Sequence, residues 1–468
     1  MSGLFGTLNV AARALQAQQI GIEVTGNNLA NSANPAYARQ RANLVESPAE
    51  TSPYGPLGTG VEVQTIQQLR SGLIDGQIQQ ENSTSSYWNS QQQALQYAQA
   101  AVGQQISSVS TSDPSGQQGI AGALNDLFNS FQSLSTDPTS ISQRQVLLAK
   151  ASDLAGRFNQ ISQSLDGLHA SLDQSLQTSV TNANGLLSDI AKLNNQIVNT
   201  ENSTTGTAND LRDLRQQKLE ELSKLVTVDT APQANGGVNV SVGGQLLVSD
   251  QNVVDTLQTY DAGGGQLLVR TTTGGVALTP TSGSIAGTID VRDGAVRTLS
   301  DSLDTLADQL ITQVNAVHTG GFSLTGSTNA KFFTGSDART IGVNQALLDN
   351  PSLVQASGVN GATGDNQVAL ALAQLANAKN STLNNQTFSQ SLDETISTMG
   401  QSLSSANGHV SDENIVQGML QQQRSSVSGV SLDEEMTNLT IYQRAYQASA
   451  RVITVADDML NTLINVMQ

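Results

Sequence analysis

The last segment of the chain carries the most regular apolar pattern in the sequence. From Leu432 to Met467 the seam positions alternate in steps of four and three residues, and nothing between Ser431 and Gln468 breaks a helix. This spacing is typical of the narrow apolar stripe of a coiled-coil helix. Ser431 and Glu434 also have the spacing of a capping box at the start of that helix. The apolar members of this C-terminal stripe are Leu432, Met436, Leu439, Tyr446, Ile453, Leu460 and Ile464.

The first segment of the chain has a matching stripe. Ser2 can cap its start, and Pro35 ends the helix by about Ala33. A narrow stripe buries little surface without a partner, and isolated helices are marginal in water. Two such stripes favour pairing of the end segments, with each other or with neighbouring copies, over packing of each on its own domain. The apolar members of this N-terminal stripe are Leu4, Leu8, Leu15, Ile22 and Leu29.

Between the two ends, helical spacing gives way to a strand-like pattern. Apolar residues recur at helical intervals through residues 73–109, 119–134, 141–197 and 210–226. At Thr227 the period switches to two residues. The alternating valines of 238–242 lead into Gly243-Gly244, and this pattern predicts a β-hairpin with a two-residue turn.

Short strands are expected to continue to about Ile289, after which helical spacing returns. We expect helices at 294–317, 365–378 and 389–425. The sequence therefore predicts an elongated multidomain fold that is mainly α with a β insertion. The expected parts are a terminal coiled-coil domain of 1–36 plus 430–468, a long-helix domain with short strands of 37–226 plus 294–429, and a β-rich domain of 227–293.

Composition excludes several classes of function. The net charge is −18 with 21 Lys and Arg, so a basic patch for nucleic acid is absent from the sequence. The chain has no Cys, which excludes disulfides and thiolate metal sites. No stretch of the sequence is apolar for long enough to insert into a membrane. The first residues lack the charged and apolar regions of a secretory signal peptide, so export without a cleaved leader is expected if the protein leaves the cell.

Residues that could carry chemistry are scattered. His169, His318 and His409 lie far apart, and none has a metal-ligand neighbour three or four residues on. The glycine pairs of the β region do not form a phosphate-binding loop. The acidic residues 433–435 sit in the first turn of a helix, where negative charge is favourable because of the helix dipole. We therefore expect no enzyme activity, no cofactor and no metal.

Two motifs carry a family likeness. Asn-Asn-Leu-Ala-Asn at residues 27–31, followed by Tyr37, resembles the N-terminal signature of flagellar rod, hook and hook-associated proteins. That signature has Gly before the tyrosine, whereas this chain has Ala36 after Asn34-Pro35. The stretches 428–435 and 442–453 are similar to the C-terminal end of the hook-associated protein 1 family. The likeness extends over nearly the whole chain and is weakest in the β insertion.

This resemblance implies an axial subunit of the bacterial flagellum that joins hook to filament and is a platform for assembly of filament proteins. The expected partners are further copies in a ring of about eleven, the hook protein, the second junction protein, and a cytoplasmic export chaperone on the C-terminal helix. The resemblance also implies type III export to the extracellular flagellum, terminal helices at the inside of the shaft and the β domain at the outside. It assigns the assembly interface to the two stripes together with Asn27, Asn28, Asn31 and Tyr37.

Other functions stay open at the level of sequence. A secreted surface adhesin or binding module could use the β region as its ligand-binding part. The second junction protein and the hook protein belong to the same family and have similar ends. The match at residues 428–435 favours the first junction protein.

Overall fold

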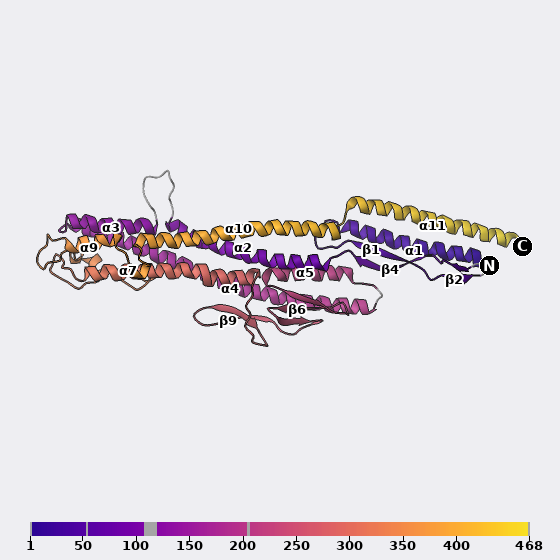
Figure 1. The fold of residues 1–468 in the computed structure, drawn as a ribbon, viewed down its shortest axis with the longest axis horizontal. Coiled ribbons are helices and arrows are strands. Elements are labelled where there is room, and N and C mark those ends of the chain that lie inside the picture. The colour runs from indigo at the N-terminus through magenta and orange to yellow at the C-terminus, as the bar shows by residue number, and fades with distance from the viewer. Residues whose placement is uncertain (1, 53–54, 107–118, 204–205, 467–468) are drawn as a thin grey trace.

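The structure is a computed structural model that describes residues 2–52, 55–106, 119–203 and 206–466. Three features expected from sequence lie outside that description: the side chain of Ser2, Met467 in the C-terminal stripe, and Val109 at the end of the second expected helix. The described chain forms a long rod, with both termini at the same end (Figure 1). No helix among the described residues is long and apolar enough to cross a membrane.

Helices dominate the rod, and the fold class expected from sequence is confirmed. The helices are α1 (Ser2–Ala30), α2 (Gly72–Ile106), α3 (Ile120–Thr136), α4 (Ile141–Ser203), α5 (Asn209–Leu225), α6 (Gly283–Val291), α7 (Arg297–His318), α8 (Gln345–Asp349), α9 (Gln367–Gln374), α10 (Phe388–Ser428) and α11 (Leu432–Val466). Shorter turns are the π-helical η1 (Arg292–Val296) and the 3-10 segments η2 (Pro351–Leu353), η3 (Leu375–Asn377) and η4 (Ser381–Leu383).

The strands form small antiparallel sheets. Near the termini these are β1 (Gln40–Glu46) with β4 (Val61–Gln68), and β2 (Glu50–Ser52) with β3 (Gly55–Leu57). Farther along the chain they are β5 (Asp229–Pro232), β6 (Val238–Val242), β7 (Gln245–Ser249), β8 (Asn252–Val253), β9 (Leu257–Asp261), β10 (Leu267–Thr271), β11 (Phe333–Thr334) and β12 (Gly342–Val343). The first four of these pair in the order β5-β6-β7-β8.

Two apolar cores hold the rod together. The larger core joins the second half of α2, α3, the first half of α4, α7, α9 and the first half of α10, with Phe131 and Phe158 fully buried in it. The smaller core joins the second half of α4, α5 and the strands β6, β7, β9 and β10, with Val240 and Leu247 fully buried. The β strands therefore pack on the side of two helices, as the lower part of Figure 1 shows.

The hairpin expected at Gly243-Gly244 is confirmed. β6 and β7 pair across this turn, and both glycines have positive φ, 55° and 77°. A two-residue turn with positive φ at both central residues matches the twist of the strands that it joins, and glycine adopts that conformation without strain. The burial of β6 alternates as its sequence does, with the three valines inside.

The helix after the β region begins earlier in the sequence than expected. The sequence pattern placed strands up to Ile289, whereas α6 already begins at Gly283. Residues such as Ile285 and Ile289 favour strands in isolation, but α6 packs closely against α2, and its Gly287 lies directly against the backbone of Tyr87. This tertiary packing outweighs the local preference. Strand β1 was also not expected from sequence.

Candidate assembly interface

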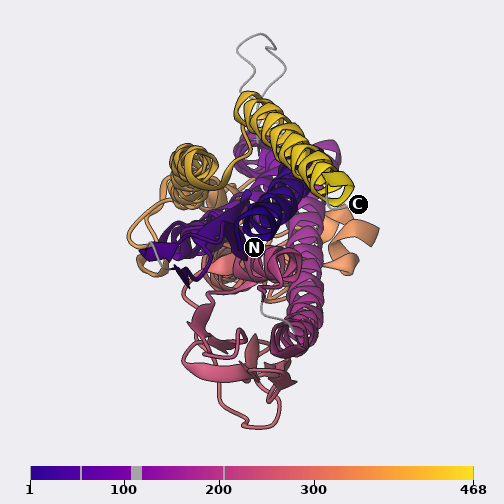
Figure 2. The same ribbon diagram turned by 90° about the vertical axis from the view of Figure 1, so that its right-hand side faces the viewer.

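The two terminal helices pair with each other. α1 and α11 run side by side and antiparallel at one end of the rod (Figures 1 and 2). A glycine of α1 lies at the contact. A Cβ built on Gly21 would lie 2.9 Å from Cδ1 and Cε1 of Tyr442. Because Gly21 has no side chain, the Tyr442 ring can lie directly against the α1 backbone.

The stripe residues lie around this contact, but they do not form its centre. Leu4, Leu8, Leu15, Ile22 and Leu29 on α1 are half-buried, as are Leu439, Ile453 and Leu460 on α11. The exposed members of the C-terminal stripe are Leu432, Met436, Tyr446 and Ile464, with exposed fractions of 40–55%. The most buried residues of α11 are instead Glu435 and Ala456. The stripe residues therefore border the contact, and several keep large apolar surface in water.

Helix α11 presents exposed apolar side chains on both sides of its buried face. At 100° per residue, one group falls on one side of that face and a second group falls on the other. We call these groups flank A and flank B. Flank A consists of Leu432, Met436, Tyr446 and Ile464, and flank B consists of Ile441, Val452, Val455, Met459 and Leu463. Val455, Met459 and Leu463 of flank B line a groove together with Leu4 of α1, yet each of the three is still more than half exposed.

The Asn-rich end of α1 forms a joint with the start of α11. Asn28 is buried and makes four hydrogen bonds. Its Nδ2 donates to the Gln40 carbonyl at 2.9 Å and to Glu435 Oε2 at 3.0 Å. Its Oδ1 accepts from the Tyr37 hydroxyl and from the Gln40 N–H, both at 2.9 Å. The side chain of Asn28 thus joins α1, β1 and α11, whereas Asn27 is exposed and Asn31 bonds back to Asn27.

Arg39 closes the same joint from the strand side. Its Nη1 lies 2.7 Å from Glu434 Oε2, and its Nη2 lies 2.7 Å from Glu435 Oε1. Its backbone N–H donates to the Ser428 carbonyl at the end of α10. The capping box expected at Ser431 and Glu434 is therefore incomplete: the Glu434 N–H reaches Ser431 Oγ at 3.5 Å, but the Glu434 carboxylate binds Arg39. An arginine close to the helix start outcompetes a backbone N–H for that carboxylate because both partners are charged.

The turn that carries Tyr37 closes without glycine. Asn34 Oδ1 accepts from the Ala36 N–H at 3.1 Å, and the Asn34 carbonyl accepts from the Tyr37 N–H at 3.1 Å. Ala36 is not among the described residues with positive φ, so its side chain is tolerated. Burial, and then the carboxylates of Asp210, Asp213 and Glu435, raise the pKa of Tyr37, and its hydroxyl therefore stays a hydrogen-bond donor.

A second cluster of charged residues, which the sequence did not predict, lies next to the joint on the side of the helical domain. Arg70 lies between Asp75 and Asp213, with Nε and Nη1 each 3.0 Å from a carboxylate oxygen. Asp213 also accepts from the Ala38 N–H at 3.2 Å. Burial raises the pKa of Asp213 to about 6, although Arg70 opposes the shift. Asp213 lies far in sequence from Arg70, Asp75 and Ala38, so residue spacing gives no sign that the four come together.

The three histidines have structural surroundings. His318 is fully buried, with Nδ1 2.7 Å from the Ala330 carbonyl and Nε2 accepting from the Gln355 N–H. Burial lowers its pKa to about 4. His409 stacks on Trp88 at 3.9 Å between ring centroids, and the partly exposed His169 lies 3.5 Å from Asp173. Across the described ranges, no three His, Asp or Glu side chains gather in a way that could hold a metal ion.

Models of known protein families match three parts of the chain. Residues 104–333 match the flagellar hook-associated protein FlgK helical domain. Residues 8–33 match the flagella basal body rod protein, and residues 421–466 match the flagellar basal body rod FlgEFG protein C-terminal region. The last two matches fall on α1 and on the end of α10 with α11, which form the pairing and the joint described above.

Whole proteins are similar as well. The flagellar hook-associated protein 1 of Bacillus subtilis (strain 168) is 30% identical over 518 residues, which cover 100% of this chain and 99% of that protein. The protein of the same name from Salmonella typhimurium is 23% identical over 562 residues, with 98% and 99% covered.

Among solved structures, the flagellar hook junction protein FlgK from Burkholderia pseudomallei has the same fold. Its TM-score is 0.64 at 16% identity, over 75% of this chain and 100% of that one. The full-length similarity to the Bacillus subtilis protein decides between the members of the wider rod and hook family. The chain therefore belongs to the flagellar hook-associated protein 1 family, as a structural component of the hook–filament junction in the extracellular flagellum and not as an enzyme.

Proposed function

We propose that this chain joins the hook to the filament and forms the platform on which filament proteins assemble. The observation that supports this most is α11, which pairs with α1 on one face and still leaves flanks A and B exposed. Large exposed apolar surface on a water-exposed helix marks an interaction site. Two flanks on one helix fit a position between two neighbours, which is what a closed ring of subunits requires.

Burial of the flanks by neighbouring subunits would contribute to the free energy of assembly. Burying one large apolar side chain contributes about 1.5–3 kcal/mol, so a flank of four such residues contributes several kcal/mol before the entropy of association is subtracted. We propose that further copies of this chain, in a ring of about eleven, supply the side neighbours. The hook protein and the second junction protein would contact the two ends of that ring. An export chaperone that covers flanks A and B in the cytoplasm would prevent early association.

The division of the chain into three domains, and their positions in the flagellar shaft, are also part of the proposal. The terminal coiled coil of 1–36 plus 430–468 would form the inside of the shaft, the helical part of 37–226 plus 294–429 would surround it, and 227–293 would face outward. Two features support this order. The exposed apolar flanks belong to the terminal part, and the β strands pack on the side of α4 that lies away from α11 (Figure 2).

The test replaces one exposed residue on each flank. Met436→Asp in flank A and Met459→Asp in flank B change side chains that are 53% and 51% exposed, so folding of the monomer should be unaffected. In a strain that lacks the native gene, we expect each variant to be exported but to leave filaments unattached, because assembly would bury an unpaired charge. Flagellin should then collect in the medium, and motility should be lost.

A matched control is Val359→Asp at the opposite end of the rod, where the side chain is 51% exposed. This variant should swim normally. Circular dichroism of the purified proteins checks that all three variants fold. Normal filaments in both flank variants would exclude α11 as the contact surface.

A further inference from the structure

A polar pocket outside the terminal helices has an unusual balance of charge. It has a volume of about 370 Å³ and lies where the start of α2, the helix α5 and the β5–β6 hairpin meet. The charged residues that line it are Arg70, Arg212, Arg215, Asp75 and Glu201. Three of the 21 basic residues of a chain with net charge −18 thus line a single pocket.

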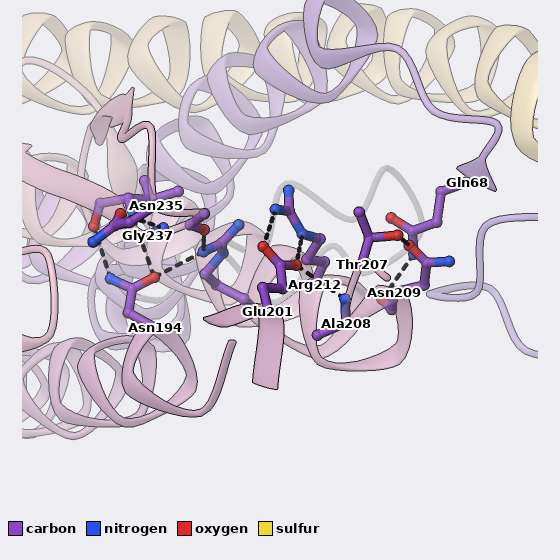
Figure 3. A network of polar contacts seen from close by, with 12 residues as sticks. Gln68, Asn194, Glu201, Thr207, Ala208, Asn209, Arg212, Asn235 and Gly237 are labelled. Atoms are coloured by element: carbon purple, nitrogen blue, oxygen red, sulfur yellow. Dashed lines mark hydrogen bonds and ion pairs between the residues drawn. The ribbon is translucent and has the colours of Figure 1, made fainter. Parts of the chain in front are cut away.

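Two of these arginines are neutralised by carboxylates. Arg212 binds Glu201 through two parallel contacts, Nε to Oε1 at 2.7 Å and Nη2 to Oε2 at 2.8 Å, which Figure 3 draws at the centre of the network. Arg70 lies 3.0 Å from Asp75 and 3.0 Å from Asp213. In both cases the positive charge is already paired within the chain.

Arg215 is different, because only neutral groups bind it. Its Nη1 donates to Asn194 Oδ1 at 2.9 Å and to the Gly236 carbonyl at 2.7 Å. Within the described part of the chain, no carboxylate oxygen lies within ion-pair distance of its guanidinium. Arg215 is only 7% exposed. Burial and then Arg212 lower its pKa to about 10, Arg70 adds to this shift, and the nearby carboxylate of Glu201 opposes it.

Burying a guanidinium without a counter-charge is costly, and the usual remedy in proteins is an anion. Asn194 cannot supply one. Its Oδ1 accepts from Arg215 and from the Val238 N–H, while its Nδ2 donates to the Val238 carbonyl, so it fastens the hairpin next to Asn235 and Gly237 (Figure 3). The polar groups of the hairpin therefore position Arg215 at the pocket without an ion pair of its own, and the nearby Glu201 already binds Arg212 through two contacts.

We propose that this pocket binds a small oxyanion, a carboxylate or a phosphate, with Arg215 as its main ligand. A guanidinium matches the geometry of two oxygens on one carbon or phosphorus, and Arg212 beside it adds positive potential. The occupant can be a free ion or an acidic side chain of a neighbouring copy, since both present the same chemistry. The proposal does not depend on the role of flanks A and B.

The pocket has room for this occupant next to α2. Gly72 and Gly76 line it, and a Cβ built on either glycine would meet no described atom within 4 Å. Gly76 is in helical conformation, so it accepts other residues without strain. A side chain placed there can extend into the pocket, and this allows a test that keeps Arg215 in place.

The experiment uses the full-length monomer and two measurements. The first is calorimetric titration with inorganic phosphate against chloride at equal ionic strength. We expect saturable phosphate binding by the wild type, a loss of affinity of at least about tenfold in Arg215→Gln, and unchanged binding in Arg339→Gln, whose side chain is 64% exposed and far along the chain.

The second measurement compares the thermal unfolding of Gly76→Glu and Gly76→Gln. The two side chains have nearly the same shape and helix propensity, so only the charge differs. We expect Gly76→Glu to have the higher Tm and to bind no phosphate, because its own carboxylate occupies the site.

The outcomes separate the two sources of the anion. Phosphate binding that depends on Arg215 supports a free ion. A higher Tm for Gly76→Glu without phosphate binding by the wild type supports a carboxylate from a neighbouring copy. Equal Tm values for the two Gly76 variants, together with no Arg215-dependent phosphate binding, would overturn the proposal, whether or not the variants of flanks A and B assemble.

Discussion

At the scale of single residues, small and amide side chains decide how the terminal helices meet. Gly21 lets Tyr442 lie against the α1 backbone, and Asn28 connects α1, β1 and α11 through four hydrogen bonds. Removing the Asn28 amide would leave buried polar atoms such as Glu435 Oε2 and the Gln40 N–H without this partner, and each such loss costs about 1–3 kcal/mol. The leucines of the two stripes contribute apolar area at the border of this contact.

Gly21 and Gly26 form a matched pair of positions for a test. Replacing glycine by alanine inside a helix normally stabilises it by up to about 1 kcal/mol. At Gly26 a Cβ would meet no described atom within 4 Å, so Gly26→Ala should raise Tm slightly. At Gly21 the new Cβ would lie 2.9 Å from the Tyr442 ring, so Gly21→Ala should lower the stability of the α1–α11 pairing by about 1–3 kcal/mol.

The measurement is amide hydrogen exchange in α11 together with thermal unfolding, and Gly26→Ala is the control. Equal or slower exchange in Gly21→Ala would mean that the helices do not approach closely at Tyr442. That result would contradict the observed packing.

The sequence identified some residues of the joint but not the hydrogen bonds that they make. Asn28 and Tyr37 were identified through the family resemblance, and both lie in the joint. Gln40, and the pairing of Glu435 with Asn28, were not expected. Asn28 and Glu435 are 407 positions apart, so only the folded chain brings them together, and no local periodicity reports such a pair. The assembly role of these residues stays a prediction.

At the scale of elements, the contact between α2 and α10 is unusually polar. Asn82 accepts from Gln417 at 3.1 Å, Gln92 donates to Asn407 at 2.7 Å, and Trp88 stacks on His409. Next to the Asn82–Gln417 contact, Glu81 on α2 and Glu413 on α10 are close enough to share a hydrogen bond between their carboxyl groups. Burial is the largest cause that raises the pKa of Glu81 to about 7, and Glu413 adds to it.

This pair predicts a pH dependence. Because the pKa of Glu81 is raised on folding from its ordinary value of 4.5, the folded state holds the proton more tightly than the unfolded state does. The contribution to stability is fully present below about pH 4.5 and is lost as the pH rises through about 7. Glu81→Gln should remove this loss and stabilise the protein by about 1–3 kcal/mol at about pH 8, with little effect at about pH 4.

Urea unfolding followed at several pH values measures this effect. Asp412→Asn changes an exposed carboxylate next to Glu413 on the same helix and is the control, with no expected change in pH dependence. If Glu81→Gln and the wild type lose stability in parallel between about pH 5 and about pH 8, the two carboxyl groups do not interact in this way.

Elements whose residue pattern repeats locally were predicted from the sequence, whereas elements that depend on tertiary packing were not. The long helices and the Gly243-Gly244 hairpin were predicted because their residue patterns repeat over many positions. The early start of α6 and the presence of β1 were not predicted. In both cases the conformation depends on packing against α2 or pairing with β4, which a local pattern does not contain.

At the scale of the whole molecule, the rod is stabilised unevenly. Every residue of the two apolar cores falls between Ala94 and Ala406, so none comes from α1 or α11. Within the described chain, the terminal helices are held by their mutual pairing, by the β1–β4 hairpin and by the joint at Asn28. A part of the molecule with so few buried apolar contacts opens at lower free energy than the cores do.

The free monomer should therefore open from its terminal end first. We expect amides of α11 in residues 432–466 to exchange at least about tenfold faster than amides of α4 in residues 147–165, which face the larger core. In isolated flagella the same α11 amides should become as slow as those of α4, because neighbours then cover flanks A and B. The α4 amides serve as the internal reference in both samples. Equal exchange of α11 and α4 in the monomer would show that the terminal helices belong to the same cooperative unit as the cores, and assembly would then add little order to them.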